Sequence, residues 1–162
     1  MPEVIWKKHQ TIPFVDIGTT GEADWARIGK STIFDLVLNA ETETLDFIED
    51  ENPTDLLKKY KPTLSQELKT MQGDKAFDAL FDMLYTLPVG EAAIRKVLLV
   101  FPKAGTTTGT FLAWQVDSTV VLSNFNTVDE KILFNLNFNG NIERGTVTIA
   151  AGQPTFTAGE GE

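Results

Sequence analysis

The sequence contains no cysteine and only one histidine, His9, in 162 residues. The lack of cysteine excludes disulfides, thiolate nucleophiles and cysteine-based zinc sites, and it is typical of proteins made in a reducing compartment. One histidine and no GxSxG motif leave the common nucleophilic catalytic sets incomplete. Motifs for P-loops, dinucleotide-binding loops and HExxH metal sites are also missing. We therefore expect no catalytic, cofactor-binding or metal-binding residues, and a protein that is not an enzyme.

Positive charge and long apolar runs are also scarce. Fourteen Lys and Arg stand against 23 Asp and Glu, giving a formal net charge of −9. Affinity for nucleic acid through phosphate neutralisation needs clustered Lys and Arg, so the charge favours a surface that does not hold DNA. The apolar run 97–101 is too short to span a bilayer, and the first ten residues lack the apolar core of a signal peptide. We expect no membrane anchor and synthesis in the cytoplasm.

What the sequence does have is strand patterning over the length of one domain, residues 1–162. In residues 131–149, Ile132, Phe134, Leu136 and Phe138 alternate with polar residues. This period of two predicts a strand with one apolar face. The pair 139–140, Asn-Gly, predicts a tight hairpin turn, with residues 142–149 returning as a second strand. Further strands are predicted at residues 13–18, 25–28, 32–38, 62–70, 95–102, 110–116 and 119–125, and residues 150–162 are expected to form a flexible tail.

One amphipathic helix is predicted at residues 74–87. Asp74 is a suitable N-cap residue, whose carboxylate would accept hydrogen bonds from backbone amides of the first turn. Phe77, Leu80, Phe81 and Leu84 follow at helical spacing, and we expect Phe77, Phe81 and Leu84 to pack against the sheet. The predicted fold is mainly β with one helix: an antiparallel β-sandwich or barrel flanked by that helix.

Residues 41–51 are the most biased segment, with six acidic residues and no basic residue. Three large apolar residues lie inside this run, so residues 41–60 are expected to form a protruding hairpin or a long loop. The acidic triplet 49–51 lacks the ligand spacing and the turn glycine of a calcium loop, and a glycosidase carboxylate pair is possible only in principle. A solvated charge run is the simpler interpretation. The motif Gly-Thr-Thr-Gly at 18–21 is not followed by the lysine that a phosphate loop requires.

Several short motifs, in this order and spacing, resemble the major tail proteins, or tail tube proteins, of long-tailed phages of Gram-positive bacteria. The resemblance covers residues 14–156. Its motifs are Phe14-Val15-Asp16-Ile17-Gly18, Trp25 with Ile28-Gly29, the acidic stretch with Glu43 and Glu49-Asp50, Tyr60-Lys61-Pro62-Thr63-Leu64, Gly73-Asp74 with Phe77-Asp78, and Asn137-Phe138-Asn139-Gly140 with Gly145-Thr146.

The resemblance implies a half-barrel or sandwich of the tail tube type and a structural role in the virion tail. Six copies would form a ring, and stacked rings would form the tube through which DNA passes without specific binding. Implied partners are further copies of the chain, a tape measure protein, a tail terminator and baseplate or tail-tip proteins, with assembly in the host cytoplasm. Tubes of contractile tails and of type VI secretion share this fold. The alternatives are therefore a tube protein of such an injection machine, or a monomeric β-barrel adaptor or ligand-binding module.

Two sets of site residues follow from this reading. Polar residues opposite an apolar strand face are expected to face the lumen, although a register error of one residue would invert the assignment. An acidic segment with exposed apolar residues is expected to contact a neighbouring subunit through charge and apolar complementarity, or else to be a mobile loop folded back on its own subunit. The expected lumen-facing residues are Asp35, Asn39, Glu67, Asn135 and Asn137. The expected inter-subunit residues are Leu45, Asp46, Phe47, Ile48, Glu49 and Asp50, with the basic pairs Lys7-Lys8 and Lys58-Lys59. Residues 1–12 are read as an arm or a frayed terminus.

Overall fold

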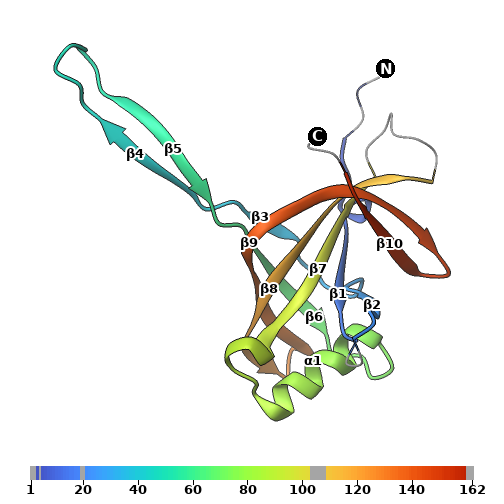
Figure 1. Ribbon diagram of the computed structural model, residues 1–162. Helices are drawn as coiled ribbons and strands as arrows, with labels where there is room; N and C mark the ends of the chain where they lie inside the picture. The colour runs from blue at the N-terminus through green and yellow to red at the C-terminus, as the bar shows by residue number, and fades with distance from the viewer. Residues whose placement is uncertain (1–2, 4, 19–20, 103–108, 160–162) are drawn as a thin grey trace.

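The computed structural model describes residues 3, 5–18, 21–102 and 109–159 (Figure 1). Its main element is an antiparallel sheet with the strand order β2-β1-β7-β8-β9-β6-β3, and β10 pairs with the outer part of β9. Strands β4 and β5 form a separate two-stranded sheet. The strands are β1 Ile12–Asp16, β2 Trp25–Arg27, β3 Asp35–Val37, β4 Ala40–Leu45, β5 Thr54–Tyr60, β6 Thr63–Lys69, β7 Ile94–Phe101, β8 Phe111–Asn126, β9 Lys131–Ala150 and β10 Gln153–Ala158; the helices are α1 Lys75–Thr86 and the short 3₁₀ turns η1 Lys8–Gln10 and η2 Gly90–Ala93.

The predicted fold class, mainly β with one helix, is confirmed. The sheet curls strongly, and helix α1 lies across its lower end in Figure 1. No helix in the described part of the chain combines the length and the apolar character needed to cross a membrane.

The second half of strand β7 is buried on both faces, because two hydrophobic clusters lie on opposite sides of the sheet there. Val97 and Leu99 belong to the cluster that includes α1, whereas Leu98 and Val100 belong to a second cluster with residues of β1, β2, β8 and β9. A continuous apolar run suits a strand that is covered on both sides. The expectation of a buried strand at this place is therefore confirmed.

Strand β9 corrects the prediction of a hairpin at residues 139–140. It runs without a turn for 20 residues, because β8 continues beside it on both sides of this point. Gln115 pairs with Glu143, but Asp117 pairs with Asn139, so β9 carries extra residues there and forms a bulge. Gly140 has a φ of +63°. The positive φ of Gly140 thus allows a bulge within one strand and does not form a turn between two strands. Beside it, the two strands predicted at 110–116 and 119–125 are also a single strand, β8.

The actual tight turn lies at residues 151–152, in the segment expected to be a flexible tail. Ala151 and Gly152 both have positive φ, of +52° and +78°, and they join β9 to β10. Two residues with positive φ are characteristic of a primed hairpin turn. Residues 153–158 of the expected tail therefore form strand β10.

Helix α1 is present where it was predicted, but its buried face is rotated. The buried residues are Ala76, Phe77, Leu80 and Met83, whereas the Phe81 side chain is 43% exposed. Phe77 is buried as expected and Leu84 only partly, and the small Ala76 and the flexible Met83 allow close approach to the sheet along one edge of the expected apolar stripe. The prediction that Phe81 packs in the core is wrong, and its ring lies at the border of the helix face, 6.3 Å from the Phe77 ring.

The N-terminus of α1 corrects a second detail. Asp74 occupies the N-cap position, but its side chain makes no capping hydrogen bond. The carboxylate of Asp78, one turn further on, instead accepts a hydrogen bond from the backbone N–H of Gly73 at 3.4 Å. Asp74 is therefore the N-cap residue, as predicted, but the hydrogen bond expected of its side chain does not form.

Candidate functional site

The β4–β5 hairpin is the most unusual feature of the molecule, because it projects away from the body (Figure 1). Residues 41–60 thus form the protruding hairpin that was one of the two predicted forms. All seven residues of β5 are exposed, as are the first five of β4. A two-stranded sheet without a covered face is marginal in water. The hairpin therefore lacks, within its own chain, the cover that normally stabilises a sheet.

The tip of this hairpin presents apolar side chains to solvent. Ile48 is fully exposed and Phe47 is 47% exposed, while Leu45 is partly buried. The backbone N–H of Asp50 donates to the carbonyl of Phe47 at 3.1 Å, which fixes a turn at the apex. The hairpin holds this tip away from the body (Figure 1). The structure thus has the geometry expected of a contact arm, and contact with a neighbour stays a prediction.

The expected basic pair Lys58-Lys59 is not a separate patch. The Lys58 Nζ lies 3.9 Å from a Glu43 carboxylate oxygen, and the Lys59 Nζ lies 3.5 Å from one of Glu41. Lys58 lies at a register shift between β4 and β5, and each of the two lysines pairs with a different glutamate of β4. These exposed ion pairs brace the hairpin by about 0–1 kcal/mol each. Lys7 is exposed near the N-terminus, and the side chain of Lys8 lies outside the described residues.

The expected lumen-facing residues lie on the face of the sheet opposite α1. Strand register brings polar residues into rows, because paired residues of antiparallel strands share one face. One row contains Asp35, Ser65, Asn135 and Val121, and the next contains Val37, Thr63, Asn137, Thr119 and Ile94. We call this surface the open face. Asn39 reaches it from the end of β3, where its amide donates to Thr63 Oγ1 at 3.3 Å.

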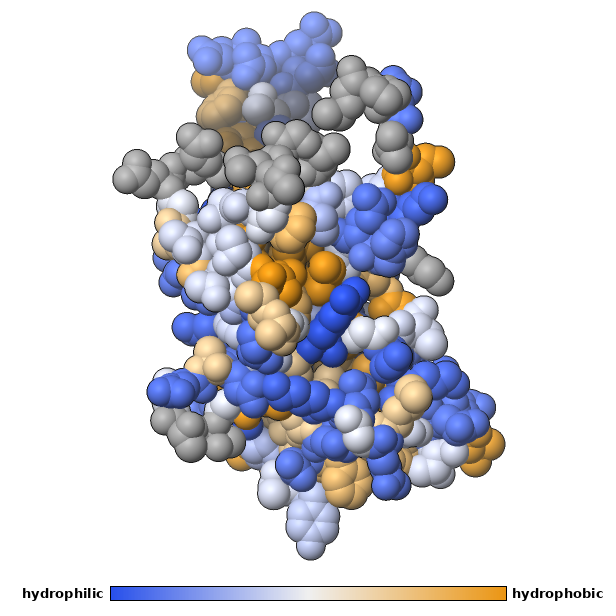
Figure 2. All heavy atoms as spheres, turned by 90° about the vertical axis from the view of Figure 1, so that its right-hand side faces the viewer, coloured by the Kyte–Doolittle hydropathy of each residue, from blue (hydrophilic) through white to orange (hydrophobic). Residues whose placement is uncertain are grey.

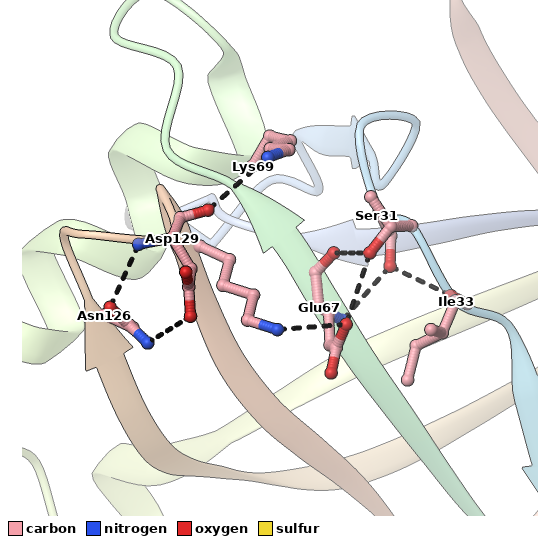
Figure 3. A network of polar contacts seen from close by, with 8 residues as sticks. Ser31, Ile33, Glu67, Lys69, Asn126 and Asp129 are labelled. Atoms are coloured by element: carbon pink, nitrogen blue, oxygen red, sulfur yellow. Dashed lines mark hydrogen bonds and ion pairs between the residues drawn. The ribbon is translucent and has the colours of Figure 1, made fainter.

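Glu67 anchors a polar network at one end of the open face (Figure 3). Its carboxylate lies 3.7 Å from the Lys131 Nζ, and Ser31 Oγ accepts a hydrogen bond from its backbone N–H at 3.2 Å. Lys69 Nζ donates to the backbone carbonyl of Asp129 at 3.4 Å. Glu67 is therefore a partnered carboxylate, and the sequence alone did not indicate this.

The open face also contains residues that the prediction omitted. Lys96 and Asp117 pair in register, so their opposite charges lie side by side next to Asn139. Val37, Ile94, Val121 and Leu133 share the face as well, so it is amide-rich and mixed in polarity. The alternation in residues 131–139 was the signal for its polar half. The apolar members could be found only by pairing the strands in register.

The other surfaces of the described structure give less indication of a functional site. The face of the body on the right of Figure 1 is mostly hydrophilic, with a small apolar patch near its middle (Figure 2). Within the described ranges, the structure contains no group of three or more His, Cys, Asp or Glu residues that could hold a metal ion. The hairpin and the open face are therefore the surfaces considered as the candidate site.

Comparison with solved structures indicates which known fold this is. A chain from the extended-state sheath/tube terminator of PVC, an extracellular contractile injection system, aligns over 88% of this chain and 97% of its own length, with a TM-score of 0.51 and 11% sequence identity. A chain from the baseplate of the anti-feeding prophage aligns over the same shares, with a TM-score of 0.47 and 9% identity. No protein-family model and no curated protein sequence matches this chain. At 11% identity the terminator structure shows that the fold is shared, over nearly the whole of both chains.

Proposed function

We propose that this chain is a structural subunit of a phage-type tail or injection machine, and that it assembles with copies of itself. In the more specific form, it forms stacked hexameric rings that make the tail tube, the conduit for DNA delivery into the host. Its partners are then a tape measure protein, a tail terminator and baseplate or tail-tip proteins. The fold shared with a component of a contractile injection system supports the general proposal. The sequence motifs that resemble major tail proteins support the specific form.

The observation that carries the proposal is the uncovered β4–β5 hairpin. Exposed apolar side chains at its tip, together with two exposed faces, are typical of a surface that a partner covers. A partner that is another copy of the chain would bury this hairpin in every subunit of an assembly. The hairpin would then gain the packing that it lacks in one isolated chain.

A second candidate within the same class is a terminator, which closes the end of a tube as a single ring. The fold likeness to a chain of a sheath/tube terminator structure favours it specifically. The two forms differ in a visible way. A tube protein yields tubes that lengthen with protein concentration, whereas a terminator yields rings of one fixed height.

The test is to measure the mass of the purified protein by light scattering over a range of concentrations and to image it by negative-stain electron microscopy. Rings or tubes are expected. In a shortened variant, Asn-Gly replaces residues 43–56 and connects Thr42 to Leu57. These two residues are paired across β4 and β5 in the structure, so a two-residue turn can join them and the variant should fold. It should stay monomeric, because the tip is gone. Val128→Ala removes an apolar side chain that is 88% exposed elsewhere, and it serves as the control.

Two results would contradict these statements separately. If the shortened variant assembles at the same concentration as the wild type, the hairpin is not the assembly arm. If the wild type remains monomeric at every concentration, self-assembly is refuted and a monomeric β-barrel adaptor or ligand-binding module becomes the better description.

A further inference from the structure

A groove lies at the base of the β4–β5 hairpin, where β5 returns to the body beside the bulge of β9. Its volume is about 790 Å³, within the range of about 300–1,000 Å³ that is usual for ligand pockets. Three aromatic side chains form part of its lining: Tyr60 of β5, Trp114 of β8 and Phe138 of β9. Lys59, Lys61, Asn141 and Arg144 also line it.

This groove is basic, although the whole chain has a net charge of −9. Three of the described lining residues, Lys59, Lys61 and Arg144, are cationic and none is acidic. Lys59 pairs with Glu41 of its own hairpin. The Arg144 guanidinium lies 6.0 Å from the centre of the Trp114 ring, so it combines charge with an aromatic surface. The groove therefore suits a partner that is both acidic and apolar.

The tip of the hairpin has this composition. Asp46, Glu49, Asp50 and Glu51 surround the exposed Phe47 and Ile48, and the tip contains no basic residue. The described ion pairs of the hairpin involve Glu41 and Glu43 near its base and none of these four acids. The tip thus carries acidic charge that complements the basic residues of the groove, and apolar side chains that can pack against its aromatic residues.

A tip cannot reach the groove of its own chain. The strands β4 and β5 have six and seven residues, which at about 3.3 Å per residue place the tip roughly 20 Å from the base of the hairpin. The extended hairpin holds the two ends apart (Figure 1). The tip that fills a groove must therefore belong to another molecule.

We infer that the basic aromatic groove at the base of the hairpin is the receptor for the acidic tip of a second copy of this chain. This inference rests on the proposed self-assembly and names the two surfaces that meet. The contact is head-to-tail, because each subunit offers a tip to one neighbour and a groove to the other, and such contacts produce rings or filaments. Apolar side chains of the tip contact Tyr60 and Trp114, while Lys61 and Arg144 set the register and speed the encounter.

Charge reversal with rescue tests the inference. Lys61→Glu with Arg144→Glu should raise the protein concentration needed for half-assembly by at least about tenfold, because like charges then face each other. Adding Glu49→Lys and Asp50→Lys in the same chain should restore assembly. Lys30→Glu, which reverses the charge of an exposed residue outside the groove, is the control for the single variant Lys61→Glu. Circular dichroism checks that each variant is folded.

Cross-linking gives a direct readout, since the natural chain has no cysteine. Ile48→Cys in one tagged protein and Asn141→Cys in another should form a mixed disulfide dimer under mild oxidation. Ile48→Cys mixed with Val128→Cys should form much less. The groove is not the receptor if the mixed dimer is no more abundant than in this control, or if charge reversal leaves assembly unchanged. When the wild type still forms rings or tubes, either result leaves the proposed function standing. If the wild type is monomeric but the mixed dimer forms selectively, the contact exists and the proposed assembly fails.

Discussion

The side-chain amide of Gln153 forms two hydrogen bonds with the backbone of Trp25, 128 positions earlier in the chain. Its Nε2 donates to the Trp25 carbonyl at 3.0 Å, and its Oε1 accepts from the Trp25 N–H at 3.2 Å. The amide thus imitates the donor and acceptor of a neighbouring strand and links β10 to β2. The second hydrophobic cluster, which includes Trp25 and Phe14, lies beneath this junction with Phe156 packed against it.

Gln153→Leu should destabilise the fold by about 1–3 kcal/mol, because two backbone groups of a largely buried residue lose their partner. Urea unfolding followed by tryptophan fluorescence measures the change. Gln72→Leu, which alters an exposed glutamine before α1, should change stability little. Equal stability of Gln153→Leu and the wild type would show that the junction does not depend on the amide.

The rotated face of α1 gives a second prediction. Leu80 is only 3% exposed and Phe81 is 43% exposed. Leu80→Ala should cost about 2–5 kcal/mol, through lost burial and a cavity under the helix. Phe81→Ala should cost clearly less, although phenylalanine is the larger residue. Chemical denaturation of both variants decides the order, and a larger loss for Phe81→Ala would contradict the observed helix face.

Two glycines of β9 should respond differently to alanine. A Cβ on Gly145 would lie within van der Waals radii of the Thr157 backbone oxygen and the Phe156 ring, so β10 must move. A Cβ on Gly140 meets nothing within 4 Å, and the cost there is only the left-handed conformation, about 1–2 kcal/mol. Hydrogen exchange should show lost protection of β10 amides in Gly145→Ala and not in Gly140→Ala. Unchanged β10 protection in both would refute the close packing of β10 on Gly145.

Local sequence chemistry predicted the elements better than their connections. Asn139-Gly140 permits a hairpin turn and a bulge equally, and only the length of β8 beside it decides between them. The true turn uses Ala151, which no turn preference would select. On α1, apolar spacing alone could not tell which edge of the stripe faces the sheet, since Leu80 and Phe81 both lie within it.

For the candidate surfaces too, the sequence predicted the type of residue better than the way the residues are brought together. Acidic residues with Phe47 and Ile48 among them were enough to predict an exposed projection. The internal pairing of Lys58 with Glu43 depends on a register shift that the sequence does not reveal. The groove was missed altogether, because Trp114 and Arg144 come together only through the pairing of β8 with β9.

The open face provides the last prediction, which concerns the passage of DNA. If this face lines the lumen, its near balance of charge, with Lys96 beside Asp117 and Lys131 beside Glu67, leaves little attraction for phosphate. Asp35→Lys with Glu67→Lys should leave assembly intact, raise the net charge of the face by four units per subunit, and slow DNA ejection from particles that carry the variant.

The same variant should also bind short duplex DNA as an assembled tube, with an affinity that falls steeply as salt is raised, because bound Lys side chains release counterions. Asp82→Lys makes the same charge change as Asp35→Lys alone, on the exposed side of α1, which faces away from the open face, and it is the control for that single variant. This control should bind DNA on the outside of the tube but should not slow ejection. Fluorescence anisotropy measures the binding, and DNA release from purified particles measures the passage. Normal ejection by the Asp35→Lys and Glu67→Lys particles, or equal slowing by the control, would place the open face away from the path of the DNA.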